Sequence, residues 1–460
     1  MKRFALVLSL FLFSTLPLPA QVQRGGGLPA PLPLFPPDNW WNIDVSAAPV
    51  DANSANFINF IGATTGLHPD FGGDAEDDPE IYGMVFITVS ASQPRVPVTW
   101  AAYGDQSDDG VPGHAAGYPI PEQAKTQTKW IESGYAGDDD QGGDRHMLIV
   151  DRDSRILYEL YRTVWNPGLN RWEAESGAIY SLDSNQRRPE TWTSADAAGL
   201  AILPGLVRYD EAFGPDPIRH AFRFTVFPTR GYVYPASHDA STSTNVNALP
   251  MGARLRLKAS KNISGYAPEV QKIFQAMKTY GLILADNGSD MYIQGTYDTR
   301  WNNDVLNPAF ASLKASDFEV VQLGWRPPVA PATGPLDFYT LPPCRLLDTR
   351  QAYGPFGGPA LPPGWQRSIQ ATGSCGIPVT AKALSVNVTA VTSPGGGYLT
   401  FFPGNGSPGS TSIVSFPPGR TRASSAVLML SSSGSGTLGV YNSPTTAPVH
   451  LTVDVNGYFQ

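Results

Sequence analysis

The sequence lacks the signature motifs of several large enzyme classes. It contains no G-x-S-x-G nucleophile elbow, no phosphate-binding P-loop and no dinucleotide-binding glycine fingerprint. Past the N-terminal region, no segment reaches the ~18 uninterrupted apolar residues of a membrane helix. The formal net charge is -8, whereas nucleic-acid-binding proteins usually carry a basic face. We therefore expect neither a nucleic-acid partner nor a membrane span.

Cysteine is scarce, with only Cys344 and Cys375 in the chain. In an exported protein, an even pair of cysteines is most simply a disulfide. This disulfide would close a loop of about 30 residues and stabilise the fold by about 3 kcal/mol. A metal site is a poorer explanation because His450 is the only histidine in that region, and a catalytic thiol is poorer still.

The N-terminus has the pattern of a secretory signal peptide. Met1-Lys2-Arg3 precedes an apolar run over Phe4–Phe13, which only Ser9 interrupts, and the small Ala20 precedes Gln21. The apolar run is too short to cross a bilayer. The pattern predicts a signal peptide over residues 1–20 and a secreted, extracellular protein, and the alternative is a buried N-terminal helix.

Composition divides the rest of the chain into modules. The 460 residues exceed what one hydrophobic core normally serves. Residues 21–37 are rich in Gly and Pro and predict an extended leader. A second Pro-rich stretch predicts a linker over 326–337. We call residues 38–325 the first module and residues 338–460 the second module.

The expected fold class is mainly β. The first module is a strand-dominated α+β domain, with helices predicted over Asp51–Ile61 and Tyr266–Tyr280 from their apolar spacing. For the second helix, Ser264 is the expected cap and Gly281 lies just past the end. The second module alternates apolar and polar residues between Gly/Pro/Ser turns, which indicates a C-terminal β-sandwich without helices.

The second module resembles a C-terminal accessory module of exported bacterial proteins. The resemblance implies a β-sandwich appended to diverse partners and no catalysis of its own. It depends on the opening run Leu341–Arg350, on Gly376–Pro378 and Ala383–Thr389, and on the closing run Val453–Phe459.

Charged residues in these motifs predict ion pairs. Asp348 and Arg350 can pair across a turn, and Asp454 sits within an apolar strand, where a buried carboxylate needs a partner. Arg345 and Arg350 are the candidates. A sugar-binding role for these charges is the alternative to a structural one.

The first module resembles uncharacterised exported bacterial proteins, and that resemblance implies no activity. It is carried by Asp38–Asn42, Gly143–His146 and Leu284–Asp290. The function must therefore be argued from the residues.

A Gly-rich loop delivers Asp144, Arg145 and His146 to the start of an apolar strand. Because side chains alternate along a strand, Asp144 and His146 share a side. His146 is a candidate general base or proton donor. The alternative is a structural histidine beside a structural Asp–Arg pair.

Carboxylates elsewhere in the first module complete the candidate acid–base set. Glu175 follows Trp172, and an apolar wall raises the pKa of a carboxyl group. Asp286 and Asp290 bracket the tight turn at Asn287-Gly288. Solvated loop charges are the alternative for Glu175, and the turn alone explains Asn287.

Metal binding is a weaker hypothesis. His146, His220 and His238 would suit zinc or copper if they converged, but the sequence has no HxH or HExxH spacing. Two acidic loops, Asp105–Gly110 and Asp138–Asp140, could hold calcium, although neither fits an EF-hand. No other cofactor is expected.

These observations favour a secreted carbohydrate-active enzyme, a glycoside hydrolase acting on a polysaccharide, since loop tryptophans can stack on sugar rings. The expected catalytic residues are Asp144, His146, Glu175, His220, Asp286 and Asp290. The expected substrate-binding residues are Trp40, Trp41, Arg145, Trp172, His238, Asp239 and Asn287. The alternatives are a non-catalytic surface or adhesion protein that binds glycan or the cell envelope, and a metal-dependent hydrolase.

Overall fold

The computed structural model describes residues 22–72, 79–110, 116–327, 334–354, 356–404, 406–432, 435–443 and 447–460. The signal peptide predicted over residues 1–20 and the middle of the predicted linker lie outside these residues. The mainly-β class is confirmed, because the described strands form five sheets and the helices are few and short. None of these helices is long and apolar enough to cross a membrane.

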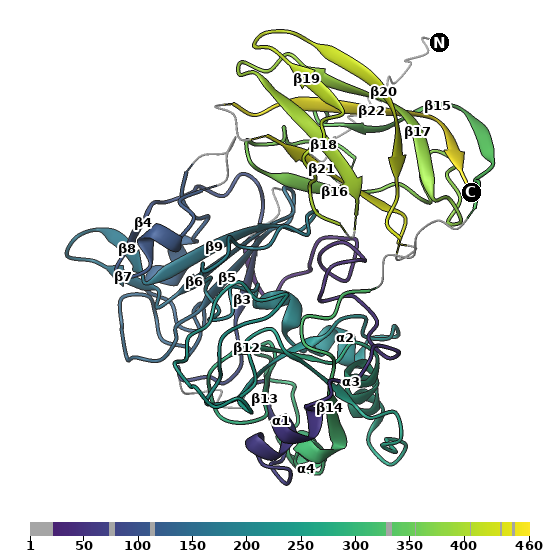
Figure 1. Ribbon diagram of the computed structural model, residues 1–460. Coiled ribbons are helices and arrows are strands. Elements are labelled where there is room, and N and C mark those ends of the chain that lie inside the picture. The colour runs from purple at the N-terminus through teal and green to yellow at the C-terminus, as the bar shows by residue number, and fades with distance from the viewer. Residues whose placement is uncertain are drawn as a thin grey trace, which may run out of the picture.

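A five-stranded sheet forms one half of the first module (Figure 1). Leu148 and Val150 on one face join the main core, while Met147 and Ile149 on the other join a second cluster. The sheet is therefore buried on both faces. In spatial order its strands are β1 (Gln23–Arg24), β3 (Phe86–Val89), β5 (Met147–Asp151), β6 (Ile156–Tyr161) and β9 (Ser176–Ser181).

A six-stranded sheet forms the other half. Its central strands β10 and β12 pair in parallel, and their residues are apolar except for Arg223 and Thr225 on β10 and Asp286 at the end of β12. In spatial order the strands are β14 (Phe318–Val320), β11 (Arg254–Leu257), β12 (Leu282–Asp286), β10 (Phe222–Thr225), β13 (Tyr292–Gln294) and β2 (His68–Asp70).

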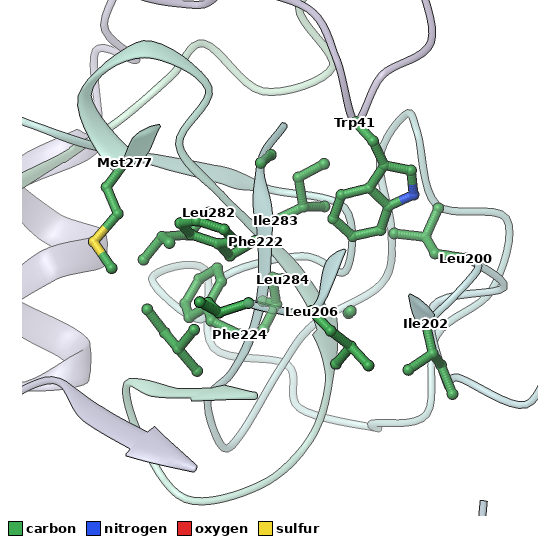
Figure 2. Packing of buried hydrophobic residues seen from close by; sticks show 14 of the residues in the cluster. Trp41, Leu200, Ile202, Leu206, Phe222, Phe224, Met277, Leu282, Ile283 and Leu284 are labelled. Atoms are coloured by element: carbon green, nitrogen blue, oxygen red, sulfur yellow. The ribbon is translucent and has the colours of Figure 1, made fainter. Parts of the chain in front are cut away.

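Helices cover this sheet. Val270, Ile273, Phe274 and Met277 recur at helical spacing and are fully buried. Figure 2 shows Met277 on one side of the strands, and Trp41 beside Leu200 and Leu206 on the other. The helices are α1 (Ser54–Ile61), α2 (Tyr209–Phe213), α3 (Pro268–Thr279) and α4 (Asn303–Ala311).

The predicted helices are present with shorter bounds. The first begins at Ser54 rather than Asp51. The second begins at Pro268, with Ala267 at the N-cap, so Ser264 does not cap it. Pro suits a first helical position because that N–H has no helical partner. Gly281, at φ 76°, then adopts the left-handed conformation that leads into β12.

A three-stranded sheet extends from the second cluster. Its strands are short, and Trp172 on the middle strand is buried against Trp165 of its neighbour, with ring centroids 5.4 Å apart. In spatial order the strands are β4 (Val98–Trp100), β8 (Arg171–Ala174) and β7 (Val164–Asn166).

The second module consists of two four-stranded sheets that face each other across a separate core. Alternate residues point inward, such as Val386 and Val388 from one sheet and Leu438 and Val440 from the other. One sheet is β15 (Phe338–Asp348), β22 (His450–Phe459), β17 (Ala383–Val391) and β20 (Arg422–Met429), and the other is β16 (Gln366–Gln370), β21 (Thr437–Asn442), β18 (Gly397–Pro403) and β19 (Val414–Phe416).

The disulfide between Cys344 and Cys375 is confirmed, with the two Cα atoms 5.7 Å apart. The predicted ion pairs are also present. Arg350 binds Asp348 through two hydrogen bonds of 2.8 and 2.7 Å, and Arg345 binds Asp454 through bonds of 2.7 and 3.0 Å. The Asp454 side chain is 30% exposed, so this pair lies at the surface and not in the core as expected.

Residues 22–37 are packed against the first module, in contrast to the extended leader predicted. Their β1 pairs with β3, and Leu34 and Phe35 are buried in the main core. The backbone pairing and two apolar side chains outweigh the Gly/Pro bias of this segment. The core of the first module therefore includes chain that precedes residue 38.

The two modules are in direct contact. The Asn185 side chain donates to Asp38 at 2.8 Å and to the Gly404 carbonyl at 3.2 Å, and the Thr437 hydroxyl donates to Asp38 at 2.7 Å. Trp365 of the second module packs against the cores of both. The junction is thus built from buried polar contacts and one shared aromatic.

Candidate active site

The candidate site lies where strand ends of the two large sheets of the first module approach each other. His146 precedes β5, Tyr161 ends β6 and Asp286 ends β12. One loop contacts both His146 and β12: the Ala195 carbonyl accepts from the His146 ring at 2.9 Å, and Ala198 N–H donates to the Ala285 carbonyl at 2.9 Å. The topology thus gathers side chains that are far apart in sequence.

His146 forms a buried ion pair with Glu132. Its Nδ1 lies 2.5 Å from the Glu132 carboxylate, and its Nε2 faces the Ala195 carbonyl. Burial is the largest single influence and would lower the pKa of His146, but the charge and hydrogen bond of Glu132, together with the Asp144 charge, outweigh it and raise that pKa to about 9. Burial would raise the pKa of Glu132, but His146 holds it below its ordinary value.

This pairing corrects the expectation that His146 is a general base. An imidazole with acceptors at both nitrogens donates from both and is protonated at neutral pH. Such a group has no lone pair with which to take a proton from substrate. His146 therefore contributes a fixed positive charge beneath the site.

Arg223 contributes a second buried charge. On β10 it is 2% exposed and binds the fully buried Asp196 through hydrogen bonds of 3.0 and 2.8 Å. Its Nη2 also lies 3.8 Å from the Asp286 carboxylate. Burial works against the Arg223 charge, but Asp196 outweighs it and raises the pKa of Arg223. Arg223 thus links the core to Asp286.

Asp286 is a carboxyl group whose pKa and exposure both suit proton transfer. Its side chain is 25% exposed, so it reaches both protein and solvent. Burial and then the Asp196 charge raise the pKa of Asp286 to about 7, against the lowering effects of Arg223 and His146. A carboxyl group that titrates near neutrality can donate or accept a proton during a reaction.

Tyr161 stands among three of the predicted carboxylates. Burial first, and then the charges of Asp144, Glu175 and Asp286, raise the pKa of Tyr161 to about 12. Asp144 is exposed, and Glu175 is 37% exposed with Arg162 3.8 Å away. Asp144 also interacts with both His146 and Asp286. The charges of Asp144, Glu175 and Asp286 therefore all act on Tyr161, and the Asp144 charge also acts on Asp286.

His220 does not belong to this group, contrary to expectation. Its ring lies between the Ala221 carbonyl at 2.9 Å and both Glu211 oxygens at 3.0 Å, and it is buried. No group of three or more His, Cys, Asp or Glu side chains in the described ranges is placed to hold a metal ion. The three-histidine set of the metal hypothesis does not converge.

The remaining predicted polar residues lie around the Asn287 turn. The Asp290 carboxylate accepts from Phe227 N–H at 2.9 Å, so it fixes the turn. The Asn287 side chain donates to Ala240 at 3.2 Å, and His238 Nδ1 lies 2.8 Å from the Ala197 carbonyl. Asp239 interacts electrostatically with the Tyr232 phenol. His238 and Asn287 therefore border the site, and Asp290 has a structural role.

Burial excludes four predicted substrate-binding residues. Trp40 is 4% exposed, Trp41 0% and Trp172 1%, so none presents a ring face to a sugar. Arg145 is fully buried, and its guanidinium donates to the carbonyls of Thr163, Asp139 and Ala136. The three tryptophan rings pack in the cores, and the Arg145 guanidinium anchors the loop whose carbonyls it binds.

Sequence reasoning missed Glu132, Tyr161, Asp196 and Arg223. Arg223 carried the clearest signal, since a charged residue inside the apolar run Phe222–Thr225 requires a buried partner. Nothing in the local pattern around Glu132 or Asp196 distinguishes either from a loop carboxylate.

Comparison with known proteins adds little. No family model matches the chain, and no curated protein matches it. Among solved structures, the coat protein of Tobacco streak virus is similar at 10% identity and a TM-score of 0.16, over 26% of this chain and 85% of that one. A TM-score this low carries no argument about fold or function.

Proposed function

We propose that the protein is a secreted hydrolase of polysaccharides, with its acid–base site at Asp286 and Asp144 in the first module. The observation that carries the proposal is the position of Asp286, a partly exposed strand-end carboxyl that faces Arg223 at 3.8 Å and shares its surroundings with Asp144 and Glu175. Hydrolysis of a glycosidic bond uses two carboxyl groups in different environments.

Asp286 is the proposed general acid. It is protonated over part of the neutral range and so can donate to a leaving oxygen. Asp144 is the proposed base, because it is exposed to water and its charge contributes to raising the pKa of Asp286. Glu175, which lies beside Arg162, is the proposed contact for substrate hydroxyl groups. His146 and Arg223 fix the electrostatic field beneath them.

Secretion and an accessory role for the second module are parts of the same proposal. The N-terminal sequence pattern and the Cys344–Cys375 disulfide support export, since disulfides persist in oxidising compartments. The sandwich of the second module positions its charged motif residues in ion pairs with one another. That arrangement supports a non-catalytic role.

The test is a hydrolysis screen of the purified full chain against a panel of polysaccharides, with release of reducing ends as the readout. We expect release from at least one polysaccharide and a loss in Asp286→Asn. Asp290→Asn, on the same turn but bonded to Phe227, is the matched control and should retain activity. No release from any polysaccharide by folded protein would overturn the proposal and favour a binding or adhesion protein.

A further inference from the structure

A polar pocket lies at the junction of the two modules, and its lining does not include Asp286. Its volume is about 240 Å³, and its lining includes Trp192, Arg188, Gln186 and Asp108 from the first module and Trp365 from the second. Both tryptophans are half-buried, so part of each indole is exposed to the pocket. We propose that this junction pocket binds one neutral sugar ring of a saccharide chain.

The polar wall of the pocket is held rigidly. The Arg188 side chain is 5% exposed and donates to the Thr193 carbonyl at 3.0 Å, to the Gln106 carbonyl and to Asp108. Asp108 also accepts from Ile179 N–H at 2.9 Å, and its side chain is 27% exposed. A carboxylate that is held by these hydrogen bonds and is partly exposed can accept hydrogen bonds from sugar hydroxyl groups.

The charge balance indicates a neutral ligand. Arg188 is neutralised by Asp108, and the neighbouring Arg187 pairs with Glu190 at 2.8 Å. Because both arginines are paired with carboxylates, neither favours an acidic sugar over a neutral one. Arg188 also lies 5.3 Å from the centre of the Trp192 ring and orients it. An aromatic face beside fixed hydrogen-bonding groups suits the apolar face and polar rim of a pyranose.

The pocket needs both modules. Ser368 N–H donates to the Asp183 carbonyl at 2.7 Å, and the Gln186 amide oxygen accepts from Gln366 N–H at 3.4 Å. These bonds attach β16 to the first module, and Trp365, the residue before β16, lines the pocket. At 240 Å³ the space is below the ~300–1,000 Å³ of pockets for drug-sized ligands. It accommodates one ring of a longer chain, which would continue across the open side.

The test is isothermal titration of the full chain with cellohexaose, xylohexaose, maltohexaose and chitohexaose in the Asp286→Asn background, which limits turnover. We expect at least one to bind, and expect Trp192→Ala and Gln186→Ala each to weaken binding at least about tenfold, as for a central contact. Trp365→Phe keeps a ring for packing and should weaken binding less than Trp192→Ala.

Trp325→Ala is the matched control, because Trp325 is half-buried but lines a different pocket. Its affinity should equal that of the parent. Failure of all four oligosaccharides to bind would overturn the proposal, as would equal binding by Trp192→Ala, Gln186→Ala and the parent. Hydrolysis is scored separately, so binding here without hydrolysis would leave this inference standing while the proposed function fails.

Discussion

Two aspartates, Asp286 in the first module and Asp348 in the second, each end a strand beside an arginine, yet their acidities shift in opposite directions. Hydrogen bonds from Arg350 hold the pKa of Asp348 well below its ordinary value. Burial beside Asp196 raises the pKa of Asp286 to about 7, because Arg223 already binds Asp196. The same residue type is thus a structural anion in one module and a titratable acid in the other.

The comparison shows that an arginine keeps the pKa of an aspartate low only when it donates hydrogen bonds to that aspartate. Arg350 donates two hydrogen bonds to Asp348. Arg223 instead donates two hydrogen bonds to Asp196, and its Nη2 lies 3.8 Å from the Asp286 carboxylate. The Asp286 carboxylate accepts one hydrogen bond, from Asn287 N–H at 2.7 Å, and none from Arg223. A partly buried carboxyl group without a bidentate arginine partner is where proton transfer is expected. The five predictions that follow test the contrast between the two modules, from the largest effect to the smallest.

The largest effect is expected from removing the acid. Asp286→Asn should lower the rate of polysaccharide hydrolysis about 10²–10⁴-fold, the usual contribution of a general acid. The matched Asp348→Asn should lower the thermal stability of the second module and leave the rate unchanged. Initial rates and melting curves for both variants provide the check. Equal rate losses in the two would contradict the assignment of chemistry to the first module.

Breaking the buried pair beneath the site should cost stability. Glu132→Gln leaves His146 buried without a counter-charge, and we expect the free energy of unfolding to fall by about 3 kcal/mol. Denaturant titration at pH 6 measures this loss. His146→Gln combined with Glu132→Gln should recover part of it, and an unchanged midpoint in the single variant would show that the pair does not stabilise the fold.

The same pair predicts a pH dependence. Because the folded pKa of His146, about 9, lies above its ordinary value of 6.5, its contribution is complete below pH 6.5 and is lost as the pH rises through 9. The lowered pKa of Glu132 means that its contribution is lost as the pH falls below its ordinary value of 4.5. The stability difference between wild type and His146→Gln should therefore shrink between pH 6.5 and 9.

Removing the disulfide should affect only the second module. Replacing Cys344 and Cys375 by serine is expected to cost about 3 kcal/mol, the loop-closure contribution of a cross-link of this length. Calorimetry should show an earlier transition for the second module, while initial rates of hydrolysis stay unchanged. A large fall in the rate would mean that the second module contributes to the chemistry.

The smallest effect is expected at the surface. Asp454→Asn removes the charge that pairs with Arg345, and the two side chains are 30% and 47% exposed. Exposed pairs contribute little, so the loss should be about 0.5 kcal/mol and should shrink further in high salt. Denaturant titration with and without added salt measures it. A loss comparable to that of Glu132→Gln would remove the contrast between the modules.

Local patterns predicted more of the second module than of the first. Alternation of apolar and polar residues predicted the β-rich second module, and Asp348 and Arg350 are only two positions apart in sequence. The site in the first module was found only in part. Asp144, Glu175 and Asp286 end or precede strands and could be predicted as candidates, but the sequence could not show that one loop contacts both His146 and β12.

The errors share a physical cause. A tryptophan near polar residues has the same sequence pattern whether its ring faces solvent or the core, and Trp41 and Trp172 face the core. Likewise, a histidine in a polar loop does not reveal its partner, and His146 binds Glu132 whereas His220 binds Glu211. Burial and pairing depend on tertiary contacts that are remote in sequence.

The most direct test of the central claim is the pH dependence of kcat/KM for the wild-type protein on a polysaccharide that it hydrolyses. If Asp286 is the general acid, kcat/KM falls as the pH rises through about 7, the pKa that burial and Asp196 give this carboxyl. The rate that remains in Asp286→Asn should lack this limb. A wild-type profile that is flat from pH 5 to 9, or a limb near 7 that persists in Asp286→Asn, would contradict the account.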